Sequence, residues 1–462
     1  MSRWIHHWNP DDDEFWEREG KAVARRNLIF SIFVEFLGFS VWLLWSVTAA
    51  KLNTAGFEFS TSQLFTLVSV PALVGATMRF PYTVAVPRFG GRNWTVVSAL
   101  LLLIPVIVLI VLVSNPSTPY WAFLVGGATA GLGGGNFASS MANISFFYPD
   151  KKKGYPLGLN AAGGNIGVAV VQLVVPFVIT MSALAVVGGA QGANGTIFLQ
   201  NAGLIWIPFI LISAVCAWLF MDNLRVAQSP IKEQAVILRR KHTWIMSWLY
   251  IGTFGSFIGY SAGLPLLISK QFPGVTLSVA FLGPLVGSLA RPIGGWLADK
   301  LGGARVTFAA FLAMIPAVLG VISFLARKSE PYAFVGFLAM FMILFVLTGI
   351  GNGSTFRMIP LIFRAHHLQH VTGADPDVEA RAIVAARRET ATVLGFTSAI
   401  GAYGGWAIPL GYGLSSSVTG GPQAALGGFI AFYLTCMLLT WWHYLRRSFA
   451  VDRLPSLASA GV

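Results

Sequence analysis

Apolar runs of about twenty residues recur along almost the whole chain, and they limit the possible folds more than any other feature. A helix of that length crosses the hydrocarbon core of a bilayer, where every backbone polar group must find a partner within the protein. Only 11% of the 462 residues are charged, whereas soluble domains carry about 25%. These features exclude a soluble protein with a large core and predict an all-α polytopic membrane protein.

The apolar runs predict about twelve transmembrane helices. They lie at residues 27–49, 63–86, 93–113, 119–147, 155–180, 199–220, 242–268, 277–298, 306–326, 331–363, 389–413 and 423–445. A polar stretch divides six of these spans from the other six. The predicted domains are therefore an N-terminal tail (1–26), an N-terminal six-helix bundle (27–221), a linker (222–241), a C-terminal six-helix bundle (242–445) and a C-terminal tail (446–462).

Basic residues mark the ends of alternate spans. They are Arg25, Arg26, Arg88, Arg92, Lys151 to Lys153, Arg239, Arg240, Lys241, Lys300, Arg305, Arg387, Arg388, Arg446 and Arg447. The links at the opposite ends, such as "VVGGAQGANGT" and "SSSVTGGP", carry almost no charge. This is the positive-inside pattern, which places both tails and the linker in the cytoplasm. It also accounts for the net charge of +13 without a nucleic-acid partner.

An internal repeat relates the two halves of the chain. Arg79 is followed at +8 by Pro87, at +11 and +12 by Gly90 and Gly91, and at +16 by Thr95, and Arg291 is followed at the same offsets by Asp299, Gly302, Gly303 and Thr307. Residues 135–147 and 351–363 show a weaker sequence similarity to each other. Two six-span halves with parallel repeats are typical of a transporter with a central site near the bilayer midplane.

The loop signature in these repeats resembles that of the major facilitator superfamily. The second half has "DKLGG" after a span, and the first half has the degenerate copy "PRFGG", with Pro87 where an Asp is usual. The resemblance implies the major facilitator fold, in which this loop joins the second and third helices of each half.

Few ionisable residues lie deep in the predicted spans. They are Glu35, Arg79 and Arg291, while Arg357 is close enough to Arg364 to reach the interface. A charge inside the membrane costs at least about 2.5–3.5 kcal/mol and so needs a partner or a wet cavity. A structural salt bridge is the competing interpretation. We favour an anion site, because repeat-equivalent arginines can face each other across a central cavity and Glu35 cannot neutralise both. Planar guanidinium groups match a planar oxyanion best.

Two glycine-rich spans indicate a narrow cavity. The fifth contains Gly154, Gly158, Gly163, Gly164 and Gly167, and the eleventh contains Gly395, Gly401, Gly404 and Gly405. The pairs Gly163/Gly167 and Gly401/Gly405 allow close approach of neighbouring backbones. Asn165 offers amide donors among the first set. This combination favours a small, flat anion over a sugar or a sugar phosphate.

These runs, together with "FASSMANISFF" and "TFGSFIGYSAG", resemble the nitrate/nitrite porter family over nearly the whole chain, including its two glycine-rich nitrate signatures. The resemblance implies that Arg79 and Arg291 clamp the substrate and that Asn165 donates hydrogen bonds to it. Phe137 and Phe254 would cover its flat faces, and Tyr250 would offer a hydroxyl. The spacing of Tyr250 and Phe254 places both on one helix face. Ordinary packing is the alternative for these aromatic residues.

Two residues depart from the expected family pattern. Glu35 stands where some relatives have an apolar residue, and Arg357 replaces a neutral polar residue. Either of them can alter proton coupling or form a local ion pair.

The expected activity is nitrate/nitrite transport by rocker-switch alternating access, as part of nitrate assimilation. Exchange of nitrate for nitrite is preferred, because an empty site with two like charges closes at high cost. Proton-coupled nitrate symport through Glu35 is the alternative. An anion channel, a non-transporting anion sensor and an organic-phosphate antiporter remain as rivals of other kinds.

Other function classes find little support in the sequence. The predicted cavity residues offer no activated nucleophile, metal cluster or acid–base pair, so we expect no enzyme and no cofactor. Cys216 and Cys436 fall inside apolar runs and suggest neither a disulfide nor a metal site. His366, His367 and His370 lie in a polar segment that reads as a surface helix. We expect a monomer in the inner, or plasma, membrane.

Overall fold

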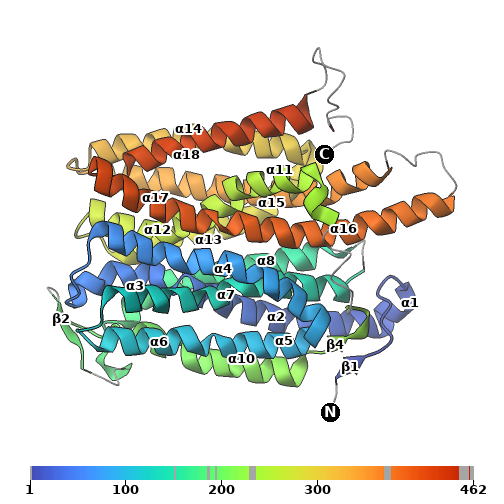
Figure 1. Ribbon diagram of the computed structural model, residues 1–462, viewed down its shortest axis with the longest axis horizontal. Helices are drawn as coiled ribbons and strands as arrows, with labels where there is room; N and C mark the ends of the chain where they lie inside the picture. Colours follow the sequence, from blue (N-terminus) through green and yellow to red (C-terminus); the bar gives the residue numbers. More distant parts are fainter. Residues whose placement is uncertain are drawn as a thin grey trace. The chain divides into compact units, whose positions relative to one another are not determined.

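A computed structural model describes residues 3–149, 152–184, 188–192, 195–227, 236–368, 376–446 and 457 of the chain. It is mostly helical (Figure 1). The elements of the first half are β1 (Trp4–Ile5), α1 (Asp13–Phe15), η1 (Trp16–Gly20), α2 (Lys21–Trp42), α3 (Leu44–Leu52), η2 (Asn53–Ala55), α4 (Thr61–Phe89), α5 (Gly91–Leu101), α6 (Leu103–Ser114), α7 (Tyr120–Phe147), α8 (Gly154–Val178), η4 (Ser182–Leu184), β2 (Ala190–Gly192), β3 (Gly195–Ile197), α9 (Asn201–Leu204), α10 (Trp206–Phe220), β4 (Asn223–Leu224) and η5 (Arg225–Ala227).

The second half continues the helical pattern. Its elements are α11 (Lys241–Tyr250), η7 (Ile251–Gly255), α12 (Ser256–Gln271), η8 (Leu277–Phe281), α13 (Leu282–Leu301), α14 (Gly303–Ala326), α15 (Ala333–Leu368), α16 (Pro376–Ala402), α17 (Gly404–Thr419), α18 (Gln423–Thr440) and η9 (Trp441–Leu445). The segments η1, η7 and η9 are π-helical turns that continue their neighbouring helices.

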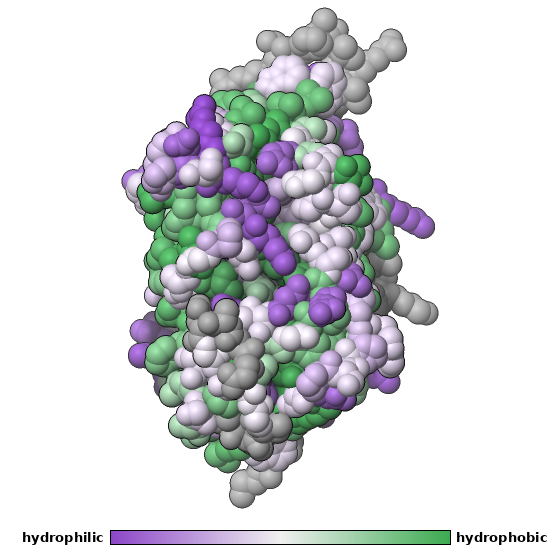
Figure 2. All heavy atoms as spheres, turned by 90° about the vertical axis from the view of Figure 1, so that its left-hand side faces the viewer, coloured by the Kyte–Doolittle hydropathy of each residue, from purple (hydrophilic) through white to green (hydrophobic). Residues whose placement is uncertain are grey.

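Eleven helices among the described residues are long and apolar enough to cross a membrane. The remaining predicted span is α7, which is 28 residues long but contains many glycine, serine and asparagine residues. Helix α10 carries large exposed apolar side chains, among them Phe209, Ile212 and Val215, as a lipid-facing surface does. Figure 2 shows hydrophilic and hydrophobic side chains interspersed on the face that it displays. The prediction of a polytopic all-α membrane protein is confirmed.

The N-terminal segment is packed against the protein rather than extended as a tail. Strand β1 pairs in parallel with β4, which follows the sixth span. Trp8 and Trp16 are buried, and the Trp8 indole donates a hydrogen bond to the carbonyl of Phe146 at 3.0 Å. The first membrane-spanning helix begins before residue 27, since the helical path runs continuously from Asp13 to Ala55.

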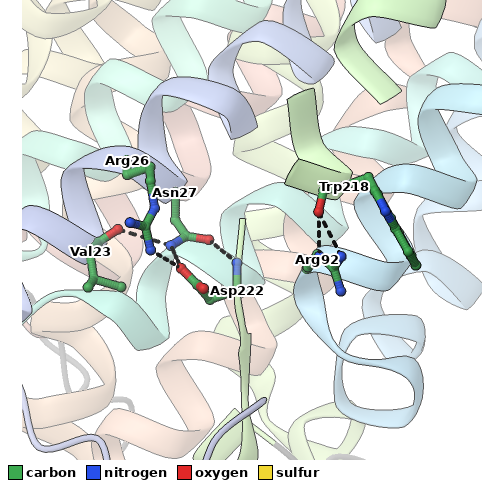
Figure 3. Close-up of polar contacts among 6 residues, drawn as sticks. All are labelled: Val23, Arg26, Asn27, Arg92, Trp218 and Asp222. Carbon is green, nitrogen blue, oxygen red and sulfur yellow. Dashed lines mark hydrogen bonds and ion pairs between the residues drawn. The ribbon is translucent and has the colours of Figure 1, made fainter. Parts of the chain in front are cut away.

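Two arginines fasten the end of α10 to other helices of the first half (Figure 3). Arg26 donates to the Asp222 carboxylate at 2.6 Å, and Asn27 donates to the same oxygen at 2.9 Å. The Asp222 backbone N–H donates to the Asn27 side chain. Arg92 donates two hydrogen bonds to the carbonyl of Trp218, at 2.9 and 2.7 Å, and so caps the last turn of α10.

We expect Asp222→Ala to lower the melting temperature of the purified protein by several degrees. Asp222 is only 7% exposed, so its removal takes the carboxylate acceptor from Arg26 and leaves the Asn27 amide with the Val23 carbonyl alone, at a cost of about 1–3 kcal/mol. The matched control is Asp299→Ala, which breaks a half-exposed ion pair and costs about 0–1 kcal/mol. Equal melting temperatures for the two variants would show that the Asp222 contacts contribute nothing.

The repeated loop signature has the same backbone geometry in both halves. Gly90 separates α4 from α5 with φ +88°, and Gly302 separates α13 from α14 with φ +90°. Residues other than glycine rarely adopt this conformation. The repeat read from the sequence therefore corresponds to a shared structural motif.

The chain divides into two compact units. Unit 1 comprises Met1–Pro230, Ile258–Leu285 and Gly405–Pro422, and unit 2 comprises the rest of the chain. Within unit 1, segments from the second half of the sequence contact the first six spans: Gln172 donates to the carbonyl of Ser261 at 2.6 Å, and Tyr412 packs on Phe65. The predicted domain boundaries stay a prediction. Residues 228–235 of the linker and 447–456 and 458–462 of the C-terminal tail lie outside the described residues.

Candidate functional site

Arg79 lies fully buried on α4, in unit 1. Its Nε donates to the backbone carbonyl of Gly134 on α7 at 3.1 Å. Its guanidinium carbon is 4.6 Å from the ring centre of Phe137 and 5.3 Å from that of Trp42. A guanidinium near aromatic rings in a buried place gains cation–π attraction and is restricted in orientation. The Arg79 guanidinium is thus a buried cation held in a defined orientation.

Glycines create the space that this arrangement needs. A Cβ atom on Gly134 would lie 2.6 Å from Trp42 and 2.8 Å from the Gly75 backbone, and one on Gly75 would lie 2.3 Å from the Trp42 indole nitrogen. The same nitrogen donates to the carbonyl of Pro71 at 2.7 Å, which fixes the indole. Close approach of α4 and α7 therefore places the Gly134 carbonyl within reach of Arg79.

Arg291 lies on α13 in unit 2 and is 5% exposed. Its Nη2 donates to the Tyr250 hydroxyl at 3.4 Å, and its guanidinium carbon is 5.4 Å from the ring centre of Phe356. Both predicted clamp arginines are thus buried beside aromatic side chains. Each belongs to a different unit, so their predicted approach across a cavity stays a prediction.

Tyr250 and Phe254 stack on each other with ring centres 5.3 Å apart and planes inclined by 21°. The π-helical turn η7 follows Tyr250 and contains Phe254. A Cβ on Gly401 would lie 2.4 Å from the Tyr250 ring, and one on Gly404 would lie 2.5 Å from the Gly255 Cα. The expectation that both aromatic residues share one helix face is confirmed, and the second glycine signature packs against them.

The first glycine signature packs α8 closely on α2. Cβ atoms on Gly163, Gly164 and Gly167 would lie 2.5, 2.7 and 2.2 Å from atoms of α2, whereas Gly158 has nothing within 4 Å. The close approach predicted at Gly163 and Gly167 is therefore present. In the second signature Gly405 contacts Ile258 and Ala72 within unit 1.

Asn165 is 1% exposed, and its amide oxygen makes no hydrogen bond to the described residues. An amide oxygen accepts hydrogen bonds and cannot donate one to an anion, so the predicted hydrogen bond from the Asn165 amide N–H to the substrate stays a prediction.

Glu35 is fully buried in unit 1 and lies among polar side chains from α7 and α8. Its carboxylate accepts hydrogen bonds from the Ser140 hydroxyl and from the Asn160 amide, the latter at 2.8 Å. Ser31 extends this cluster through a 2.8 Å contact with Ser140. These hydrogen bonds stabilise a buried carboxyl group.

Arg357 forms the local ion pair that the sequence left open. Its Nε lies 2.5 Å from the Asp299 carboxylate, and the two side chains are 47% and 54% exposed. Asp299 belongs to the "DKLGG" loop signature, so Arg357 stabilises that loop rather than a deep site.

The histidines of the 364–388 segment do not form a metal-ligand cluster among the described residues. His366 contacts Arg240 at 3.0 Å, and His367 contacts Glu389 at 3.2 Å. His370 lies outside the described residues.

Sequence reasoning missed the neighbours that position the predicted residues. They are Trp42 and Gly134 beside Arg79, Phe356 beside Arg291, and Ser140 and Asn160 beside Glu35. The dense "GLGGGN" run was the available signal for Gly134, since such a run indicates a close helix contact. Nothing in the local sequence distinguishes Trp42 or Phe356 from other aromatic residues in these spans.

Comparisons with known proteins agree with the fold. Residues 28–375 match the family model of the Major Facilitator Superfamily. The chain is 44% identical to "Nitrate/nitrite transporter NarU" of Escherichia coli K12 over 96% of this chain and 97% of the relative. It is 38% identical to "Probable nitrate/nitrite antiporter NarK2" of Thermus thermophilus, over 96% of this chain and 97% of the relative.

Among solved structures, the xylose transporter XylE from E. coli has the same fold, with a TM-score of 0.62 at 13% identity, covering 91% of this chain and 99% of that one. The transporter FucP gives a TM-score of 0.54 at 15% identity, covering 89% and 98%. The family-model match over residues 28–375 and the identity to the named relatives establish the family. The chain belongs to the major facilitator superfamily and, within it, to the nitrate/nitrite transporter family.

Proposed function

We propose that the protein transports nitrate and nitrite across the inner membrane by alternating access. The observation that carries this proposal is the buried Arg79 guanidinium, oriented by the Gly134 carbonyl and placed beside two aromatic rings. Relatives named as nitrate/nitrite transporters support the choice of anion. Transport, rather than an enzymatic reaction, is the role that this fold and these relatives favour.

Each predicted residue has a role in this proposal. Arg79 and Arg291 bind the oxygens of the planar anion through their guanidinium forks. Asn165 and Tyr250 add neutral hydrogen bonds. Phe137 and Phe254 cover its flat faces, and their contacts with Arg79 and Tyr250 keep them oriented.

We propose exchange of nitrate for nitrite as the mode of transport. When the two halves close over an empty site, two arginine charges approach each other in a medium of low dielectric constant, which is costly. A bound anion removes much of that cost. The occupied transporter therefore changes state more easily than the empty one, and each crossing in one direction requires an anion for the return.

Counterflow in proteoliposomes tests this mode. We expect vesicles loaded with nitrite to take up labelled nitrate at a rate that does not depend on an imposed pH gradient. Empty vesicles should take up little. Uptake into empty vesicles driven by the proton gradient alone would contradict exchange.

Proton-coupled nitrate symport is a second candidate, favoured by the buried Glu35 cluster with Ser140 and Asn160. Under exchange, Glu35→Gln should keep counterflow within about tenfold of the wild-type rate, the effect expected for one altered hydrogen bond. Symport predicts a different result, in which Glu35→Gln abolishes proton-driven uptake while counterflow continues. The same vesicles, measured with and without a pH gradient, distinguish the two.

The proposal also includes the topology read from the basic residues. Both termini and the 222–241 linker would lie in the cytoplasm, dividing the chain into two six-helix bundles that act as a monomer. A channel would conduct without saturation as nitrate concentration rises, and a sensor would bind nitrate without counterflow. Either result would contradict transport by exchange.

A further inference from the structure

A basic cavity of about 280 Å³ lies in unit 2, away from the residues assigned to the anion site. Residues 239–242, at the start of α11, line one side of it, and Ile362, Phe363 and His366 of α15 line the other. All four side chains at 239–242 are basic: Arg239, Arg240, Lys241 and His242.

Arg240 is held in place by an acidic partner. It donates to both carboxylate oxygens of Glu389 on α16, at 3.1 and 2.8 Å, and contacts His366 at 3.0 Å. This bidentate pair offsets one positive charge and fixes the guanidinium. Arg240 therefore contributes to the shape of the cavity and little to its net charge.

The two neighbours of Arg240 supply the uncompensated charge. Arg239 and Lys241 are exposed, and neither makes an ion pair with the described residues. Arg240 is also the N-cap of α11, without a side-chain capping bond, so the positive end of the helix dipole points to the same place. Two free cations and a helix N-terminus around one cavity select an anion.

The surroundings of the cavity are apolar. Ile362 and Phe363 are buried. On the next two turns of α11, beyond the residues that line the cavity, Trp244 is 51% exposed and donates its indole N–H to the carbonyl of Leu238 at 2.9 Å, and Trp248 is 41% exposed. Exposed indoles of this kind mark the membrane interface, where one side of the ring is apolar and the other is polar. A ligand at this position would meet both a cationic pocket and a lipid-facing surface.

We propose that this cavity binds the phosphate group of an anionic phospholipid of the surrounding bilayer. Basic pockets between transmembrane helices suit such headgroups, and each lysine or arginine near the surface adds to the attraction. Arg239 and Lys241 bind the phosphate, Arg240 holds the pocket open through Glu389, and the acyl chains lie along the apolar surface beside Trp244. This site is separate from nitrate binding, and the proposal stands whatever anion is transported.

The test measures phosphatidylglycerol bound to the full-length protein. Wild type and the double variant Arg239→Gln/Lys241→Gln are placed in phosphatidylcholine nanodiscs with increasing phosphatidylglycerol, and retained lipid is counted by native mass spectrometry. We expect the double variant to bind phosphatidylglycerol roughly tenfold to thirtyfold more weakly. The control is Arg305→Gln, an exposed basic residue at the same end of the unit 2 helices. It should stay within about twofold of wild type, because it carries no cavity contact.

Two further measurements keep the result interpretable. The melting temperature in pure phosphatidylcholine should be the same for the double variant and for wild type, and Arg239→Lys/Lys241→Arg should restore binding because it keeps both charges. Wild-type retention of phosphatidylglycerol by the double variant would overturn the site. Displacement of phosphatidylglycerol by millimolar inorganic phosphate, with equal binding of that phosphate in detergent, would overturn the lipid as its ligand.

Discussion

Replacing Arg79 by lysine is expected to weaken nitrate binding about 10- to 100-fold while leaving the protein folded. Lysine keeps the charge but loses the planar fork, including the Nε–H that the Gly134 carbonyl orients at 3.1 Å. A hydrogen bond to a charged group contributes about 1.5–3 kcal/mol, which corresponds to this range of affinity. Lysine would also lose the contacts of the guanidinium carbon with the Phe137 and Trp42 rings, at 4.6 and 5.3 Å.

The test compares the nitrate affinity of the purified variant with that of wild type, by calorimetry or by competition in counterflow. Arg291→Lys should behave in the same way. Arg357→Lys is the matched control, because Arg357 lies in a half-exposed ion pair with Asp299. If Arg79→Lys or Arg291→Lys binds nitrate with near wild-type affinity, bidentate recognition by that arginine is wrong.

Replacing Gly134 by alanine is expected to abolish counterflow. The new methyl group would lie 2.6 Å from Trp42 and 2.8 Å from the Cα of Gly75. Trp42 cannot move aside without breaking its bond to the Pro71 carbonyl, and the α4 backbone at Gly75 cannot yield as a flexible side chain would. The helices must separate, and the carbonyl that orients Arg79 moves with them.

Gly158→Ala is the control for that experiment. It also places a methyl group in a glycine-rich helix, but nothing lies within 4 Å of it. Because alanine favours the helix by about 1 kcal/mol over glycine, this variant should express and transport at least as well as wild type. Wild-type counterflow by Gly134→Ala would mean that close packing beside Arg79 is not needed for transport.

The fold was predictable because its signals are repeated. Long apolar runs predicted the spans. The matching offsets after Arg79 and Arg291 predicted equivalent loops, and the glycines of these loops have nearly the same φ. The span that hydropathy marks most weakly is α7, since its glycines and polar residues serve helix contact and the Arg79 site rather than lipid exposure.

The immediate surroundings of the arginines were less predictable. Both Trp42 and Phe356 approach through tertiary packing between spans distant in sequence, and no local pattern fixes that pairing. The N-terminal segment is another example. Its polar composition indicated a cytoplasmic tail, whereas Trp8 and Trp16 are buried against α2 and α7. The aromatic residues Trp4, Trp8, Phe15 and Trp16 among polar neighbours were the available sign of that packing.

The pairing of β1 with β4 has a consequence for how the protein is made. Trp4 and Ile5 leave the ribosome long before their strand partners, Asn223 and Leu224. At about 5–20 residues per second, synthesis of the intervening chain takes roughly 10–40 s. During that time the N-terminal strand has no partner strand, whereas the α2 and α7 residues that bury Trp8 and Trp16 are made before β4. The pairing of β1 with β4 forms only after the sixth span has been made, so it marks the completion of the first half of the chain.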